Sequence, residues 1–251
     1  MKISIVTVVR NGRTTLPRML ASLHAQSHTR IEHIVQDGGS TDGTQEYLRA
    51  NGFPGMQLES APDDGIYDAI NKGIKRATGS VIGLLHADDM LANRGVVASI
   101  AEAFADPEVD GVYGDLQYVA RDDVTRVIRN WRAGRFNRAA LRRGWMPPHP
   151  TLYLRREIFG HAGLYDTSYR ISGDYEGMLR FLSDEELTLH YIPQTLVRMR
   201  MGGVSNQSLR QMLRKSGEDY RAIRKNKVGG VGTLLAKNLR KLPQFIARDQ
   251  V

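Results

Sequence analysis

The sequence contains no cysteine, so no disulfide can cross-link the fold and no thiolate can act as a nucleophile or metal ligand. It also lacks an apolar run long enough to span a bilayer. The N-terminal apolar run over residues 3–9 is too short for a signal peptide, and no small-residue cleavage site follows it. We therefore expect a globular protein of the cytoplasm rather than a secreted or membrane-spanning one.

Acidic residues are scarce only near the C-terminus. Residues 1–209 contain 24 Lys+Arg and 24 Asp+Glu, whereas residues 210–251 contain 11 basic and 3 acidic residues. The C-terminal segment thus holds the whole net charge of +8. A neutral body with a basic tail predicts a polyanionic partner for the tail, either anionic lipid or nucleic acid.

Apolar residues recur among the basic residues of this tail at helical spacing. That pattern is typical of a helix lying on an anionic membrane. It is equally typical of a helix that packs on the rest of the protein and keeps its basic face in solvent, and both alternatives stay open here. The apolar positions are Leu213, Tyr220, Ile223, Leu234, Leu235, Leu239, Leu242, Phe245 and Ile246.

Strand and helix patterns alternate through the first half of the chain. This alternation predicts an α/β fold with a mainly parallel central sheet and helices on both faces. Strands are expected at residues 3–9, 32–35, 56–60 and 81–85, and helices at 15–25, 44–49, 67–77 and 96–104.

Two adjacent carboxylates, Asp88 and Asp89, follow the apolar run 80–85, directly after His86 and Ala87. Such a pair is costly where a buried strand leaves the core unless a cation neutralises it. Mg²⁺ and Mn²⁺ do so while they bind phosphate oxygens of a substrate. The alternative is an ordinary turn or helix cap.

The loop over residues 37–44 is rich in glycine and turn-forming residues but is neither a Walker loop nor a dinucleotide fingerprint. Either it is a simple capped loop, or Asp37 accepts a hydrogen bond from a nucleobase edge. Ligands of such sheets bind beyond the carboxyl ends of the strands. We therefore expect Asn11, Asp37 and the Asp88–Asp89 pair to converge on one cleft.

Polar side chains also gather over residues 62–73. Asp63 and Asp64 start a predicted helix, where they favour its dipole. Asp68 and Lys72 follow one turn apart. Lys72 is a candidate phosphate ligand, and the alternative is that it merely pairs with Asp68.

Two later positions are candidates for acid–base chemistry. Asp174 follows a glycine at a predicted helix start, so it is either a cap or a general base for an acceptor hydroxyl. His149 lies between prolines in the segment 146–150, where a structural role competes with a catalytic one.

Arginine recurs every third residue between residues 126 and 138. On a helix this spacing forms a broad basic band, although Gly134 and Gly144 indicate that such a helix is broken. The band is either a solvated face or a surface for a diphosphate-bearing acceptor or lipid headgroups. Its members are Arg126, Arg129, Arg132, Arg135 and Arg138, followed by Arg142 and Arg143.

Together these segments resemble the family 2 glycosyltransferases of bacterial polysaccharide assembly, over residues 1 to about 207. The resemblance implies the GT-A fold (Rossmann-like), a nucleotide-sugar donor, a divalent metal (Mn²⁺ or Mg²⁺) and inversion at the anomeric carbon. The segments appear in the family's order: residues 6–12, the loop 37–44, 64–73, 87–89 and 173–176.

By this resemblance Asp37 binds the nucleobase, and Asp88 and Asp89 form the family's metal and ribose motif, with Asp89 as the metal ligand. Asn11 joins them at the donor. Two more positions match residues near the donor, with roles that the resemblance does not define: Asp64 and Lys72.

Asp174 corresponds to the family's catalytic base. The chain departs from the family pattern at His86, where many relatives have Asn, Asp or Ser, and at Gly38, where relatives often carry a second aspartate. His86 either touches the ribose or metal shell or fills space.

The resemblance predicts an inverting, metal-dependent transfer of a hexosyl or N-acetylhexosaminyl group from a nucleotide sugar, with UDP favoured, to a saccharide or lipid-linked saccharide in cell-surface polysaccharide synthesis. We expect a catalytic domain at residues 1–208, with donor half 1–105 and acceptor half 106–208, and a basic tail at 209–251. If the tail binds a membrane rather than packing on the domain, it would contact the inner face of the cell membrane.

Two alternatives remain. One is an inactive nucleotide-sugar-binding protein, against which the presence of Asp89 and Asp174 counts. The other is a basic nucleic-acid-binding protein, suggested by a pI of about 9.8. It lacks the interleaved aromatic residues of a single-strand platform, so we expect no nucleic-acid partner.

Overall fold

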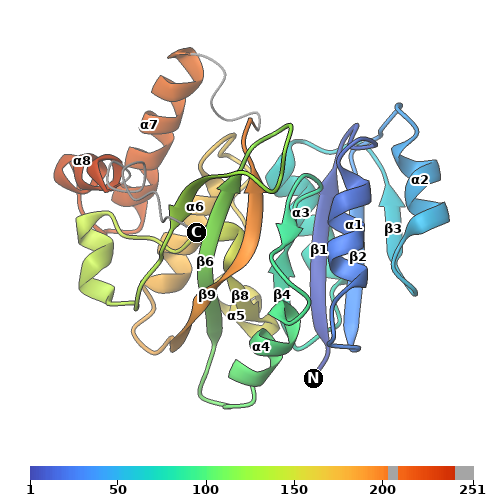
Figure 1. Ribbon diagram of the computed structural model, residues 1–251. Helices are drawn as coiled ribbons and strands as arrows, with labels where there is room; N and C mark the ends of the chain where they lie inside the picture. The colour runs from blue at the N-terminus through green and yellow to red at the C-terminus, as the bar shows by residue number, and fades with distance from the viewer. Residues whose placement is uncertain (203–208, 241–251) are drawn as a thin grey trace.

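A computed structural model describes residues 1–202 and 209–240 of the chain (Figure 1). Every strand and helix expected over residues 1–105 is present, with ends that differ by a few residues. In this half the elements are β1 (Ile3–Val9), α1 (Leu16–His24), β2 (Ile31–Asp37), α2 (Thr44–Asn51), β3 (Gln57–Ser60), α3 (Ile66–Arg76), β4 (Val81–Leu84), β5 (Met90–Leu91) and α4 (Val96–Ala103).

The second half begins with a long strand and ends with two helices that lie far from α2 and β3 (Figure 1). Two short 3₁₀ helices, η1 and η2, lie between its strands. Its elements are β6 (Gly111–Val119), β7 (Val127–Trp131), η1 (Arg138–Arg143), η2 (His149–Thr151), β8 (Tyr153–Arg155), α5 (Arg156–His161), α6 (Gly173–Leu182), β9 (Leu189–Arg200), α7 (Leu209–Lys225) and α8 (Val231–Leu239).

One sheet runs through the molecule in the order β3-β2-β1-β4-β8-β6-β9-β5, and β7 pairs with the edge of β6. The first four strands pair in parallel, as expected from the alternating pattern. Beyond β4 the sheet becomes mixed, because β8 runs antiparallel to both β4 and β6. The fold is therefore α/β, and β3, β2, β1 and β4 form the parallel part of its sheet.

Helices cover both faces of this sheet. Leu16, Met19 and Leu20 of α1 are buried on one face together with residues of α4. Ile70 and Ile74 of α3 are buried on the other face with residues of α5 and α6. The strands between them are buried along most of their length, including polar residues such as Ser4 and Thr7 of β1 that bond within the sheet.

The arginine series does not form a helix. Its first part lies in and around strand β7, where the Arg129 guanidinium stacks 4.4 Å from the Tyr118 ring centroid. Farther along, Arg138 begins η1 and donates to the backbone carbonyl of Leu187 at 3.4 Å. The three-residue spacing is thus divided between a strand, a loop and a 3₁₀ helix, and no single basic band results.

The described part of the basic tail packs with one face on α6 and η1. Ala222 and Ile223 of α7 are fully buried, and α8 contacts α7 and η1. The opposite side of α8 exposes Val231, Leu235 and Leu239, at 58–62% of their surface. The tail residues Leu242, Phe245 and Ile246, like the expected boundary at residue 208, lie outside the described residues.

Among the helices of the described ranges, none has the length and apolarity that crossing a membrane requires.

We expect His33 to make the protein less stable as the pH falls below about 6.5. His33 is fully buried in β2, and burial lowers its pKa to about 3. The unfolded chain then binds a proton that the folded chain does not. Stability is therefore lost progressively down to the folded pKa, by up to about 1.4 kcal/mol per pH unit.

Denaturant unfolding between about pH 7 and 5, above the carboxylate range, measures this slope. The variant His33→Gln keeps an amide near the Nε2 atom that lies 3.0 Å from the Thr7 hydroxyl, and we expect a shallower slope from it. An unchanged slope in the variant would contradict the assignment.

Candidate active site

The loops that follow β1, β2 and β4 meet at one edge of the sheet. A Cβ added to Gly12, after β1, would lie 3.6 Å from the Cβ of Ala87, after β4. The backbone N–H of Gly12 donates to the Thr44 hydroxyl of the β2–α2 loop at 2.9 Å. The structure thus brings the predicted donor-side segments together.

Asn11 and Asp37 are linked through Ser40. The Asp37 carboxylate is fully buried and accepts hydrogen bonds from the N–H and hydroxyl of Ser40 and, at 2.6 Å, from Ser60. Asn11 adopts a left-handed conformation (φ 53°), donates its N–H to the Ser40 hydroxyl and accepts from Thr41 N–H. The Asp37 side chain therefore lies beneath this loop and holds it together by accepting hydrogen bonds from hydroxyl and amide groups.

Gly38 faces the Asp63 side chain. A Cβ at position 38 would lie 2.4 Å from the Asp63 Oδ2 atom, closer than carbon and oxygen can approach. Asp63 is itself held by the N–H of Gly65, at 3.0 Å. The Asp63 carboxylate thus occupies the space beside residue 38, and a longer side chain at that position would have to displace it.

Asp64 and Lys72 lie on either side of the start of α3. Asp64 is exposed, and its carbonyl accepts a hydrogen bond from Arg170 at 3.2 Å. Lys72 forms an ion pair with Asp68 at 2.8 Å and donates to the Pro62 carbonyl. In this arrangement Lys72 already has its helical partner, and its role as a phosphate ligand stays a prediction.

Asp89 is the most strongly perturbed carboxylate of the site. It is 1% exposed, and neither of its oxygens accepts a hydrogen bond of normal geometry from the described residues. Burial and the neighbouring Asp88 raise its pKa well above the usual range, against the opposite effect of the Arg200 N–H and guanidinium. A cation beside this pair would stabilise the ionised form.

The described residues contain no cluster of three His, Asp or Glu ligands suited to a metal ion. A cation at Asp88–Asp89 would need further oxygen ligands from a bound molecule, as Mg²⁺ does when it binds substrate phosphates. Asp88 is partly exposed and Asp89 is not, so Asp88 is the more accessible of the two. The pair fits a hard cation shared with a phosphate-bearing ligand.

Asp174 lies in the first turn of α6. Its Oδ1 atom accepts from the backbone N–H of Tyr175 at 2.8 Å and from the Tyr67 hydroxyl at 3.3 Å. Burial, followed by the charge of Asp174, raises the pKa of Tyr67, so its phenol stays protonated as a donor. Asp174 remains partly exposed, as a general base requires.

Both histidines that the sequence left undecided lie near these carboxylates. The His86 and His149 ring centroids are 6.3 Å apart. Burial lowers the pKa of His86, while the charges of Asp88 and Asp174 act in the opposite direction. Burial lowers the pKa of His149 to about 4, again against the effect of Asp174. Asp88 and Asp174 therefore act on one shared group although 86 positions separate them in the chain.

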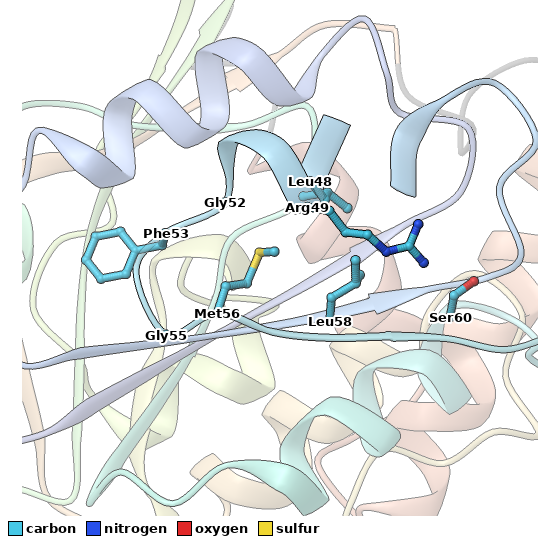
Figure 2. Close-up of a pocket in the computed structure, with 8 residues that line it drawn as sticks. All are labelled: Leu48, Arg49, Gly52, Phe53, Gly55, Met56, Leu58 and Ser60. Atoms are coloured by element: carbon cyan, nitrogen blue, oxygen red, sulfur yellow. The ribbon is translucent and has the colours of Figure 1, made fainter. Parts of the chain in front are cut away.

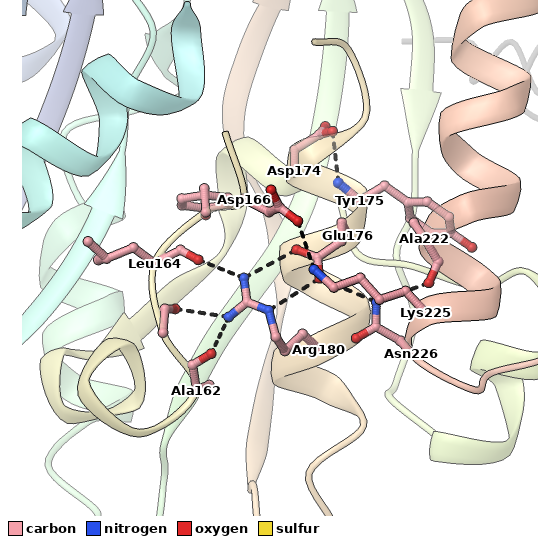
Figure 3. A network of polar contacts seen from close by, with 12 residues as sticks. Ala162, Leu164, Asp166, Asp174, Tyr175, Glu176, Arg180, Ala222, Lys225 and Asn226 are labelled. Carbon is pink, nitrogen blue, oxygen red and sulfur yellow. Dashed lines mark hydrogen bonds and ion pairs between the residues drawn. The ribbon is translucent and has the colours of Figure 1, made fainter. Parts of the chain in front are cut away.

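A buried ionic network holds the helix that carries Asp174 (Figure 3). Glu176 is fully buried and pairs with Arg180 at 3.2 Å and with Lys225 at 3.0 Å. Arg180 also donates to the backbone carbonyls of Ala162 and Leu164. α6 is thereby tied to the preceding loop and to α7.

Sequence reasoning missed Tyr67 and Tyr165 as parts of this site. The Tyr165 hydroxyl lies 2.9 Å from His149 Nε2, and its backbone exchanges two hydrogen bonds with Asn71 of α3. Tyr67 and Asn71 lie within the segment 64–73, but their hydrogen-bond partners are about a hundred residues away in the sequence. No local pattern carries that information.

The hollow in Figure 2 lies elsewhere, between α2 and β3 at the outer edge of the sheet, with a volume of about 420 Å³. Phe53, Met56 and Leu58 contribute apolar walls. None of the predicted site residues lines it, although Ser60 at one end donates to Asp37. We therefore assign the site from the carboxylates rather than from this hollow.

Comparison with known sequences matches residues 4–171 to the family described as glycosyl transferase family 2. A PGL/p-HBAD biosynthesis glycosyltransferase of Mycobacterium bovis (strain BCG / Pasteur 1173P2) is 32% identical over 208 residues, which cover 81% of this chain and 78% of the relative. An uncharacterized glycosyltransferase of Mycobacterium tuberculosis (strain CDC 1551 / Oshkosh) is 34% identical over 188 residues, covering 71% and 68%.

Two solved structures share the fold. S. aureus TarS 1–349 in complex with UDP-GlcNAc superposes with a TM-score of 0.70 and 14% identity, covering 91% of this chain and 66% of that one. The mannosyltransferase PcManGT from Pyrobaculum calidifontis, in complex with GDP-Man and Mn²⁺, gives a TM-score of 0.67 and 19% identity, covering 98% and 73%.

Proposed function

Since the chain belongs to glycosyl transferase family 2 and has the GT-A fold, we propose that it transfers a sugar from a nucleotide-sugar donor to an acceptor hydroxyl with inversion at the anomeric carbon. The observation that carries this proposal is a chain of contacts between the two carboxylate sites. The ring of His86, two residues before Asp88, lies 6.3 Å from the ring of His149 (centroid to centroid). The Tyr165 hydroxyl lies 2.9 Å from His149, and the Tyr165 ring stacks on Tyr67, whose hydroxyl lies 3.3 Å from Asp174. A donor-side carboxylate and a candidate base thus lie in one site.

Asp37 and Asn11 would bind the nucleoside end of the donor, with Asp64 and Lys72 beside it. Asp88 and Asp89 would hold Mn²⁺ or Mg²⁺, and the supporting observation is that the buried carboxylate of Asp89 accepts no hydrogen bond of normal geometry from the described residues. When bound, such an ion neutralises the donor diphosphate as negative charge develops on the leaving group.

Asp174 would accept the proton of the acceptor hydroxyl. The acceptor oxygen forms its bond to the anomeric carbon from the face opposite the nucleotide, and the bond from that carbon to the diphosphate oxygen breaks. The Tyr175 N–H orients the carboxylate by donating to Oδ1, and the Tyr67 hydroxyl shares its one proton between Oδ1 and the Ile171 carbonyl. One displacement therefore inverts the configuration.

A UDP-sugar is the favoured donor, with a hexosyl or N-acetylhexosaminyl group transferred. The two solved neighbours bind UDP-GlcNAc and GDP-Man. Both ligands are nucleotide sugars, which supports this class of donor, and they differ in the nucleobase. We propose a saccharide or lipid-linked saccharide acceptor in cell-surface polysaccharide synthesis. Residues 106–208 would bind this acceptor and supply the general base.

The tail at residues 209–251 would bind the anionic inner face of the cell membrane. Val231, Leu235 and Leu239 recur at four-residue spacing along the exposed side of α8. The segment that contains them carries the net positive charge of the chain. An exposed apolar stripe within a basic segment is the pattern of an interfacial helix.

We expect Asp174→Asn to lower kcat by roughly 10²-fold or more, because an amide cannot accept the acceptor proton. The dissociation constant of the donor should change by less than about twofold, because Asp174 acts on the acceptor. Steady-state kinetics and donor titration measure the two effects. Asp184→Asn, an exposed carboxylate just beyond α6, is the matched control. Full activity in Asp174→Asn would show that Asp174 is not the general base.

We expect one class of nucleotide sugar to raise the melting temperature only with Mn²⁺ or Mg²⁺ present, and Asp89→Asn to abolish that metal dependence. A ligand that binds only the folded state must raise its melting temperature. Thermal-shift assays with UDP-, GDP- and dTDP-sugars measure this. Asp88→Asn should retain a weaker metal-dependent shift. If only Asp88→Asn lost it, the metal ligand would be Asp88.

We expect the protein to float with vesicles that contain anionic lipid and not with neutral ones. The triple variant Val231→Ser, Leu235→Ser, Leu239→Ser should float less, because its apolar contact with the acyl boundary is removed. Its melting temperature serves as the control, since all three side chains are already exposed. Equal flotation of variant and wild type would exclude this surface.

A further inference from the structure

The Glu218 side chain of α7 binds the backbone of the segment that leads into α6. Its Oε2 atom accepts hydrogen bonds from the N–H groups of Ile171 at 2.8 Å and Ser172 at 2.9 Å. The N–H of Arg170 lies 3.2 Å from both carboxylate oxygens. One side chain therefore collects three consecutive backbone donors of the segment 170–172.

This segment ends two residues before Asp174. Ser172 is the N-cap residue of α6, but its side chain does not cap the helix. The first N–H groups of a helix have no partner within it and carry partial positive charge. The Glu218 carboxylate, which is 11% exposed, supplies negative charge beside that end from another helix.

The donor half holds the same segment from the other side. The Tyr67 hydroxyl of α3 donates to the Ile171 carbonyl at 2.6 Å. The Arg170 guanidinium donates to the Asp64 carbonyl at 3.2 Å. The backbone that carries Asp174 is thus fixed between α3 and α7, with its N–H groups bound by one helix and a carbonyl by the other.

α7 is itself locked in place by α8. Asp219, next to Glu218, pairs with Lys237 of α8 at 2.6 Å, and both side chains are only 3% exposed. The Lys237 ammonium lies 3.3 Å from the ring centroid of Tyr175, the neighbour of Asp174. Removing either member of such a buried pair is strongly destabilising.

α8 also packs closely against η1. A Cβ on Gly144 would lie 2.2 Å from the backbone nitrogen of Lys237. The Thr233 hydroxyl donates to the Arg142 carbonyl at 2.9 Å. The position of Glu218 is therefore fixed by contacts that reach back to the acceptor half, and the described tail is built into that half.

We propose that Glu218 is a positioning residue for the transfer reaction: by binding the N–H groups of residues 170–172, it sets the orientation of Asp174. The inference rests on the proposed role of Asp174 as the general base. It assigns to the described part of the basic tail a second task besides membrane contact. A small displacement of a catalytic group lowers the rate of the chemical step without weakening donor binding.

We expect Glu218→Ala to lower kcat by about 10- to 100-fold, with the donor KM within about twofold of wild type. Glu218→Gln keeps the side-chain volume and one acceptor oxygen, so it should restore much of the rate. Steady-state kinetics at a temperature well below every melting point measures both. Arg224→Ala, an exposed charge on the same helix, should have wild-type kinetics.

A merely structural role is tested by Ile223→Val, which removes a buried methyl group from α7 and leaves every hydrogen bond between Glu218 and the 170–172 backbone in place. That variant should lower the melting temperature while kcat stays within about twofold. If kcat instead follows melting temperature across the Ile223 and Glu218 variants, Glu218 is structural and the proposal is wrong. If Glu218→Ala does not fold, Glu218→Asp replaces it, because the shorter side chain cannot reach all three N–H groups. A lowered kcat with an unchanged donor KM in Glu218→Asp then supports the proposal, and a wild-type kcat overturns it.

Failure of the proposed function gives a different result. Full activity in Asp174→Asn would show that Asp174 is not the base, whatever Glu218 does. An inactive Asp174→Asn beside a fully active Glu218→Ala would leave the function in place and remove only the positioning role.

Discussion

The parallel pairing of β1 with β2 and β4 is the constraint on which the site depends. In register, Val9 lies beside Asp37, and Val6 lies beside Leu84. Parallel strands end at the same edge of a sheet, so the three following loops must meet there. Buried polar partners help to hold this register, because the Ser4 hydroxyl donates to Glu32 at 2.5 Å and the Thr7 hydroxyl lies 3.0 Å from His33 Nε2.

Carboxylates gather at this edge, and each is stabilised differently. Asp37 is bound by hydroxyl and amide donors, and Asp68 by Lys72. Asp174 accepts from Tyr175 N–H and the Tyr67 phenol. Asp89 is the exception, because it is buried and accepts no hydrogen bond of normal geometry from the part of the chain that the structure describes. The charge that would balance Asp89 is best supplied by a cation that arrives with the donor, so donor binding and neutralisation would occur together.

The C-terminal helices connect two regions that the linear sequence keeps apart. Their inner side holds α6 through Glu218 and the Glu176–Lys225 ion pair, next to the candidate base. Their outer side exposes the apolar stripe of α8. A single helical pair thus lies between an exposed apolar stripe and the backbone that carries Asp174.

The sequence by itself determined strands β1 to β4 and the helices between them, to within a few residues at their ends, and the carboxylates that follow these strands, because apolar runs and turn residues encode strands and loops locally. It also led to the family, since ordered motifs are read directly along the chain. Only the tertiary structure decided that the arginine series is divided between β7 and η1 and that His86 and His149 meet. It likewise decided that Glu218 binds the 170–172 backbone. These contacts join residues tens of positions apart, and no local periodicity records which distant backbone a buried side chain will reach.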